Sequence, residues 1–296
     1  MLAIKSAYSS WSQFWFESDN PLALALVRIS LGLSMILTYM GRFWELEYFS
    51  EHSVISKAFV QEMIEPSLNI PFFSIFNLGI DPIFFQVAFM ALLVFFTLGL
   101  LNRWGVFILW FLHLAFLYRN IAIIFGADFV SATFLFYMVF ADSQRYFSLG
   151  SYFKKGLNLK PDLFSSISVR MMQLQMSLLY AFTGFEKFKG GTWWDGTALW
   201  NVFMNSQFTI ADLTWFRHVP MVIVFLGMLT LIFEVYFPVM VYSKKFKIPW
   251  LTMGLFFHLG ITVLLGLYTF SFVMLSIYWI FLTEDEIRNL KKIVFK

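Results

Sequence analysis

Long apolar runs decide what this chain of 296 residues can fold into. Residues 104–141 and 249–283 are nearly continuous apolar stretches. A helix that spans a bilayer needs about 20 residues, so each of these stretches is too long for one span. Each also contains a polar break, from Arg119 to Asp128 in the first and from Leu267 to Ser271 in the second. We therefore predict that each stretch folds into a tightly turned helical pair.

The other apolar runs raise the expected number of transmembrane helices to about eight. Hydrophobic residues make up 59% of the chain and charged residues 13%, which is far from the average of soluble proteins. The sequence has no cysteine, which excludes disulfides, iron–sulfur clusters and thiol catalysis by its own side chains. We predict an all-α polytopic membrane protein, with a single transmembrane domain over 1–296 and no soluble domain. The expected spans are residues 21–41, 82–101, 104–120, 127–141, 170–187, 220–242, 249–267 and 269–283.

Residues 1–20 are too polar for a secretory signal and predict an interfacial amphipathic segment, with Trp11, Phe14, Trp15 and Phe16 facing lipid. With this number of spans, both termini fall on one side. Most Lys and Arg residues outside the spans lie on that side, so we expect it to be cytoplasmic. Lys187 and the acidic 42–81 loop then lie at the opposite face. We expect the membrane to be a bacterial inner membrane.

Two charged residues fall inside expected spans, where a charge is costly and therefore points to a function or a partner. Arg28 lies in the first span and Glu234 in the sixth. They are expected either to pair with each other or to bind backbone groups. Pro238 follows Glu234 by four residues and predicts a kink, because proline cannot donate a backbone hydrogen bond.

Histidines also occur within expected spans, at His113 and His258. A lone histidine on an apolar helix is more often an interhelical hydrogen-bonding residue than a ligand. The chain shows no metal-ligand spacing of His with carboxylates, no HExxH, no GxSxG and no P-loop. We therefore expect no metal ion and no nucleic-acid partner.

The stretch 180–200 carries the densest set of candidate functional residues. Lys187 lies at the end of a span, beside Trp193, Trp194 and Asp195. Desolvation disfavours the ammonium, so a lysine in such a place can act as a base. Lysine and tryptophan at the end of a membrane helix also serve as interfacial anchors, and this alternative stays open.

Arg119 and Asp128 are expected near the same membrane face as Lys187. Together with the tryptophans they predict a polar chamber under an aromatic cover, open toward lipid. A chamber of this kind suits an amphipathic ligand with a flat head and an apolar tail. A quinone and a lipid both meet this description.

Five segments carry motifs in a fixed order along the chain: Asp19 to Gly32, Phe140 to Ser148, Gly184 to Phe188, Trp194 to Gly196, and Phe257-His258 with Phe270 to Leu275. In the same order they resemble the motifs DP…L…FR…G, FMDANRYWS, GVKKL, WVEG and FH…FSYVML of the HTTM family, the transmembrane domain shared with vitamin K-dependent gamma-glutamyl carboxylase. Glu234 matches an acidic position in the sixth helix of that domain.

The resemblance implies that Lys187 is the base that deprotonates a reduced quinone similar to vitamin K hydroquinone, with His258 in a supporting polar role. Oxygen would be the co-substrate, with carbon dioxide if carboxylation follows. Glu186 replaces the first lysine of the family's pair, and a carboxylate there favours the protonated form of Lys187. Gly126-Ala127 replaces the carboxylase's Asn-His, with Asp128 the nearest polar residue. The resemblance therefore favours quinol oxygenation over glutamate carboxylation.

Three functions follow from these residues. The first is a carboxylase-like membrane enzyme, a quinol-oxygenating lyase or oxidoreductase, in which Lys187 is the base. The second is a non-catalytic membrane partner for the maturation or export of a peptide or toxin. The third is a protein that binds a lipid or quinone without chemistry. Membrane lipids are expected partners in each case, and the sequence leaves the oligomeric state open.

Overall fold

The computed structural model describes residues 9, 11–16, 20–50, 53–63, 81–153, 162–207 and 209–294. Within these ranges the regular structure is helical and there is no strand, which confirms the all-α class. The chain divides into two compact units. The first unit is Met1–Arg170 with Thr283–Lys296, and the second is Met171–Leu282. The expectation of one domain over 1–296 stays a prediction.

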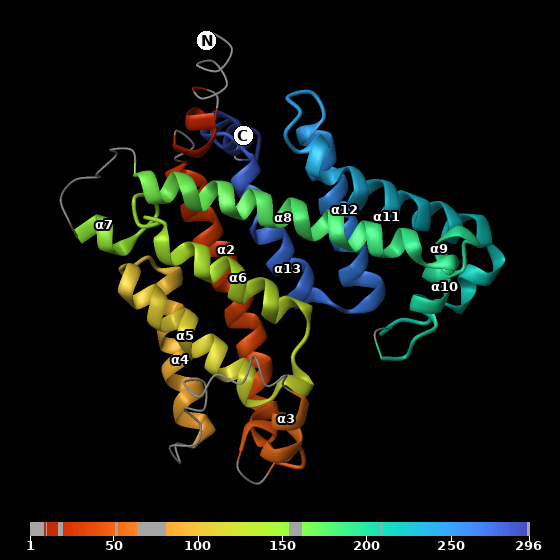
Figure 1. The fold of residues 1–296 in the computed structure, drawn as a ribbon, viewed down its shortest axis with the longest axis horizontal. Coiled ribbons are helices and arrows are strands. Elements are labelled where there is room, and N and C mark those ends of the chain that lie inside the picture. Colours follow the sequence, from red (N-terminus) through yellow and green to blue (C-terminus); the bar gives the residue numbers. More distant parts are fainter. Residues whose placement is uncertain are drawn as a thin grey trace. The chain divides into compact units, whose positions relative to one another are not determined.

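The first unit is built on α2 (Pro21–Gly41), which packs against α4, while α5 packs against α6 (Figure 1). The helices α5 and α6 are the predicted first helical pair, and the turn between them falls at the predicted polar break. The other elements of this unit are η1 (Arg42–Phe49), α3 (Lys57–Met63), α4 (Pro82–Thr97), α5 (Arg103–Arg119), η4 (Ile121–Ile123), α6 (Gly126–Phe140), α7 (Leu149–Phe153), the start of α8 (Leu163–Lys189), and α14 (Glu284–Val294).

Polar side chains fix the starts of three helices in this unit. The side chain of Asn20 accepts a hydrogen bond from the Ala23 amide at 3.1 Å, and Pro21 is the first residue of α2. Asp81 and Asn102 cap α4 and α5 in the same way. These caps satisfy amide groups that a helix leaves unpaired at its first turn, which is why the apolar runs become helical at these positions.

The second unit contains the rest of α8, with α11 packed against α10 and α12, and α12 packed against α13. Gly266 ends α12 in the left-handed conformation, with φ of 70°, and α13 begins two residues later. This turn is the predicted break of the second helical pair. The elements that follow α8 are α9 (Gly191–Trp194), α10 (Ala198–Phe203), η5 (Thr214–His218), α11 (Pro220–Met240), α12 (Lys247–Leu265), α13 (Tyr268–Ser276) and η6 (Tyr278–Phe281).

Each expected span overlaps a helix, but the count of eight spans is not confirmed. Among the described residues, three stretches are long and apolar enough to cross a membrane: Pro21–Phe49, Pro220–Met240 and Lys247–Leu265. Pro82–Thr97, Gly126–Phe140 and Tyr268–Phe281 are apolar but shorter. The orientation of the termini stays a prediction.

The interfacial segment expected over 1–20 is described only in part. Residues 11–16 are helical, and the Trp11 side chain is exposed. Phe14 lies under the guanidinium of Arg170, with 4.2 Å from the Arg170 Cζ atom to the ring centroid. That these side chains face lipid stays a prediction. Much of the 42–81 loop, including Glu51 and Glu65, lies outside the described residues.

Candidate functional site

Lys187 and Glu234 form an ion pair in the second unit. Lys187 lies in the last turn of α8, and its Nζ atom is 2.7 Å and 2.9 Å from the two carboxylate oxygens of Glu234 on α11. The Lys187 side chain is 27% exposed and that of Glu234 only 6%. The cationic partner of Glu234 within this unit is therefore Lys187.

A glycine lets the two helices approach closely at this pair. A Cβ atom on Gly184 would lie 2.9 Å from Cγ2 of Val235, closer than real Cβ contacts, and 3.0 Å from its amide nitrogen, which is also tight. Gly184 precedes Lys187 by three residues, and Val235 follows Glu234, so the narrow contact lies beside the ion pair. The Thr183 hydroxyl donates to the Tyr180 carbonyl at 3.1 Å. The carboxylate is thus held from α8 by Lys187.

Pro238 lies inside α11, four residues after Glu234, and the helix continues through it to Met240. Proline has no amide hydrogen, so the backbone carbonyl of Glu234 lacks its usual helical donor. The residue whose carboxylate binds Lys187 is therefore also the one that loses the usual helical hydrogen bond to its carbonyl.

The aromatic residues after α8 differ in their relation to Lys187. Its Nζ atom lies 5.8 Å from the ring centroid of Trp193, within the range of a cation–π interaction. The indole of Trp194 instead donates to the Phe188 carbonyl at 2.8 Å. The Asp195 carboxylate accepts from the amide and hydroxyl of Thr197, and these hydrogen bonds lower the pKa of Asp195. Of the three predicted residues, only Trp193 touches the amine.

Glu186 does not act on Lys187 as the sequence led us to expect. Its carboxylate binds Lys189 at 2.6 Å, and both side chains are largely exposed. The carboxylate that contacts Lys187 is that of Glu234, which sequence spacing could not place there.

His258 belongs to a buried chain of polar groups in the same unit. The Tyr180 hydroxyl lies 2.6 Å from Nε2 of His258 and 2.7 Å from the Tyr278 hydroxyl. Among the described residues the other ring nitrogen, Nδ1, has no hydrogen-bond partner. His258 contacts these tyrosines, and its role in catalysis beside Lys187 stays a prediction.

Sequence reasoning missed Tyr180, although the spacing offered a signal. Tyr180 precedes Lys187 by seven residues, which is about two helical turns and places both on one face of α8. Tyr278 could not be found in this way, because a close approach through Gly254 brings it in. A Cβ atom on Gly254 would clash with the Tyr278 hydroxyl oxygen.

Asp128 and Arg119 belong to the first unit and have partners there. Asp128 binds Arg42 at 2.6 Å, and its second carboxylate oxygen accepts from the Phe125 amide at 3.1 Å. Arg119 donates to the Ser50 carbonyl. Both side chains thus hold the turn between α5 and α6 together with the end of α2 and η1. Their expected grouping with Lys187 joins residues of the two units and stays a prediction.

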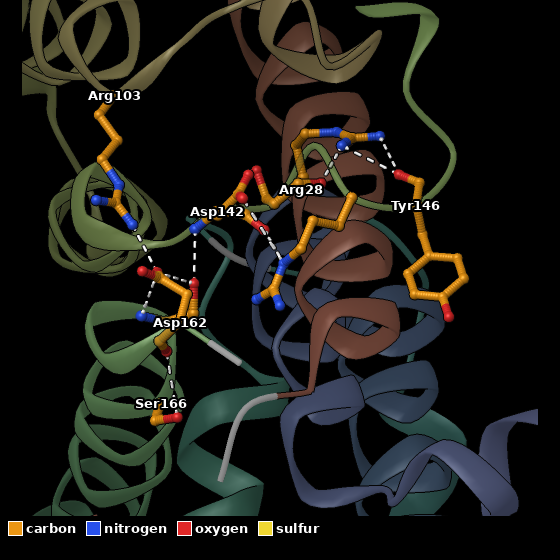
Figure 2. Close-up of polar contacts among 9 residues, drawn as sticks. Arg28, Arg103, Asp142, Tyr146, Asp162 and Ser166 are labelled. Carbon is orange, nitrogen blue, oxygen red and sulfur yellow. Dashed lines mark hydrogen bonds and ion pairs between the residues drawn. The ribbon is translucent and has the colours of Figure 1, made fainter. Parts of the chain in front are cut away.

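Arg28 binds backbone groups, which was the alternative to pairing with Glu234. Its guanidinium donates to the carbonyls of Ser143, Tyr146 and Phe147, and its Nε atom to that of Thr97 at 3.3 Å. Figure 2 shows it beside the segment that follows α6. Arg28 therefore joins α2 to the end of α4 and to that segment.

An apolar groove of about 520 Å³ lies on the second unit, between α10, α11 and α12. Thr230 lines it one helical turn before Glu234, and both residues are buried on the same face of α11. The groove could hold the apolar tail of a lipid-soluble ligand. Other residues that line it are Leu226, Phe256, Phe257, Ile261 and Leu264. Among the described residues, no group of three or more His, Asp or Glu side chains could hold a metal ion.

Comparison with known proteins gives one match. The HTTM domain profile matches residues 16–285, which is nearly the whole chain and includes both units. Comparison with curated proteins and with solved structures gives no match. The apolar helices and the match together make this an integral membrane protein. We conclude that the chain belongs to the HTTM domain family, as its sequence motifs had indicated.

Proposed function

We propose that this protein is a carboxylase-like membrane enzyme in which Lys187 removes a proton from a lipid-soluble substrate, a reduced quinone. The observation that carries the proposal is the contact of the partly exposed amine with the almost buried Glu234 carboxylate. An interfacial anchor needs only water and lipid headgroups around its amine. An amine held by a buried carboxylate is instead in a defined position, with a proton acceptor at 2.7 Å.

The pair itself supplies the free amine that a base requires. A bound ligand that covers Lys187 removes water, and in an apolar medium two separated charges become costly. One proton then moves from Nζ to Oε2 of Glu234, so that an N–H bond breaks, an O–H bond forms, and the pair becomes a neutral amine and a neutral acid. The amine next takes the proton of the substrate hydroxyl and is an ammonium again. Glu234 thus stores one proton during this step.

The groove on α10, α11 and α12 supports a substrate with a long apolar tail, because it reaches within one turn of Glu234. Trp193 supplies an aromatic surface beside the amine, on which a flat ring could stack. A reduced naphthoquinone would supply the hydroxyl proton and a ring that oxygen converts to the epoxide, with water as the other product.

The test is epoxide formation by the purified protein in lipid nanodiscs, supplied with a reduced naphthoquinone and oxygen. We expect the wild type to form epoxide and Lys187→Met to lose at least about 100-fold in rate, the contribution of a general base. Glu234→Gln should also lose activity, because the amide cannot accept the proton. Glu186→Gln is the matched control, since it alters the neighbouring charge without touching Lys187, and it should stay active.

Three outcomes would replace this proposal. Unchanged turnover in folded Lys187→Met would exclude Lys187 as the base. Binding of the quinone without epoxide in the wild type would favour a quinone- or lipid-binding protein. If the wild type forms no epoxide and binds no quinone, and a peptide stays bound through purification, the non-catalytic partner is favoured. Carbon dioxide incorporation into a glutamyl peptide, measured in the same assay, would extend the enzyme to carboxylation.

A further inference from the structure

Two adjoining cavities of the first unit share one residue, Arg103, at the start of α5. The first has about 290 Å³ and is lined by polar residues of the turn before α5, of the segment after α6, and by Asp162. The second is an apolar groove of about 350 Å³ along α5 and α6, lined by Trp104, Phe107, Phe136, Val139 and Phe140. Arg103 thus borders both a polar cavity and an apolar groove.

The polar cavity carries both signs of charge. Arg103 Nη2 lies 2.5 Å from the Asp162 carboxylate, which also accepts from the amide and hydroxyl of Ser165. The Asp142 carboxylate is 39% exposed and lies 3.7 Å from Arg145 Nε, which is a loose contact. Figure 2 shows Arg103, Asp142 and Asp162 in this arrangement. One cation and two carboxylates therefore border the same cavity.

The backbone around the cavity is held by its own hydrogen bonds. Gln144 donates to the Leu101 carbonyl, and the Asp142 amide donates to the Ser165 hydroxyl at 2.8 Å. Asn102 accepts from the Gly105 amide at 2.9 Å. The segment after α6 is thus fixed to both the start of α5 and the start of α8, so the charged groups are positioned before any ligand arrives.

We propose that this edge of the first unit binds a glycerophospholipid with a primary-amine headgroup, such as phosphatidylethanolamine. One acyl chain lies in the groove between Trp104 and Phe140. The phosphate binds the guanidinium of Arg103, which has five N–H donors and is 43% exposed beside Asp162. The ammonium group donates to the Asp142 carboxylate.

Charge complementarity decides between lipid classes. An anionic headgroup would be attracted by the guanidinium of Arg103 but repelled by the carboxylates of Asp142 and Asp162. A choline headgroup has the right charges but no N–H group to donate to Asp142. A protonated primary amine satisfies both charges and the hydrogen bond. The exposed indole of Trp104, next to Arg103, is the side chain expected where a headgroup meets the hydrocarbon region.

The experiment measures lipid binding to the detergent-purified protein by native mass spectrometry. Phosphatidylethanolamine, phosphatidylcholine and phosphatidylglycerol with identical acyl chains are titrated separately. We expect the ethanolamine lipid to bind most tightly. Asp142→Asn and Arg103→Gln should each weaken it by about tenfold, the value of one charge-assisted hydrogen bond. Asp142→Asn should weaken the choline lipid less than the ethanolamine lipid, since the choline lipid loses a charge attraction but no hydrogen bond.

Two controls separate this site from nonspecific effects. Asp212→Asn removes an exposed carboxylate of the second unit and should leave all three affinities unchanged. Tailless glycerophosphoethanolamine should fail to displace the lipid, and displacement would mean that the groove contributes nothing. Equal affinities for the three lipids with no effect of Asp142→Asn would overturn the proposal. Preference for phosphatidylglycerol would also overturn it, in favour of an anionic lipid at Arg103.

Discussion

Arg42 Nη2 lies 2.6 Å from the Asp128 carboxylate, and both side chains are almost completely buried. The Arg42 guanidinium also lies 4.7 Å from the Tyr39 ring centroid. His113 adds two contacts, one from Nδ1 to the Tyr39 hydroxyl at 2.6 Å and one from Nε2 to the Asp128 carbonyl at 3.2 Å. Arg42, which the sequence placed in the extramembrane 42–81 loop, is therefore the partner of Asp128, a candidate ligand-binding residue. The contacts among Arg42, Tyr39, His113 and Asp128 join α2, α5 and α6.

Loss of Arg42 should destabilise the protein strongly. Removing one member of a buried ion pair costs about 3–5 kcal/mol, because the other charge remains buried without its partner. We expect Arg42→Met to lower the midpoint of thermal unfolding in detergent, measured by circular dichroism. The double variant Arg42→Met with Asp128→Leu should recover most of the loss, and no recovery would show that the two residues do not act as a pair.

Tyr180→Phe should destabilise the second unit without changing its shape. The substitution removes the hydroxyl that lies 2.6 Å from His258 and 2.7 Å from Tyr278, and leaves both buried groups without this partner. A buried polar group without a partner costs about 1–3 kcal/mol. Chemical unfolding would measure the change. Tyr236→Phe is the matched control, because Tyr236 is exposed, and it should have little effect.

Two glycines of α12 should respond oppositely to alanine. In Gly254→Ala the new methyl group would meet the Tyr278 hydroxyl and the Phe233 ring, so we expect a cost of about 1–3 kcal/mol from overpacking. Gly260 has nothing within 4 Å of the added atom. There the substitution should be neutral or stabilise the helix by up to about 1 kcal/mol. Equal effects on the unfolding midpoint would contradict the close contact at Gly254.

Thr197→Val should raise the pKa of Asp195 toward its ordinary value. Hydrogen bonds from the hydroxyl and amide of Thr197 lower this pKa, and valine retains only the amide. Because the pKa is lowered in the folded protein, the associated stability is present above the ordinary pKa and is lost as pH falls through the lowered one. Carbon-13 NMR titration of the Asp195 carboxyl would measure the shift, and an unchanged pKa would exclude the hydroxyl as its cause.

Local sequence signals located the helices well. The expected spans that start at residues 21 and 82 begin where α2 and α4 begin, and the break expected from Leu267 follows directly on the end of α12. The start of α8 was predicted seven residues too late, because the stretch from Leu163 is polar and hydropathy reports membrane spans rather than helices. The break of α13 at Ser276 carries no Gly or Pro signal and was missed.

The partners of the charged residues could not be predicted in the same way. Glu234 was known to need a partner, but the choice between Arg28 and Lys187 depends on how α11 is rotated and on the close contact at Gly184. Arg42 looked like a solvated loop residue because its partner lies 86 positions away. The sequence thus shows that a buried charge needs a partner, whereas tertiary packing decides which group becomes that partner.

The contacts of Arg28 have a consequence for how the chain tolerates substitution. Its guanidinium is held by main-chain oxygens of Ser143, Tyr146 and Phe147, which every amino acid provides. In a saturation library the side chains at these three positions should therefore vary without disturbing this junction, while position 28 should accept nothing else. Lysine would fail too, since one ammonium group cannot reach carbonyls on two segments at once.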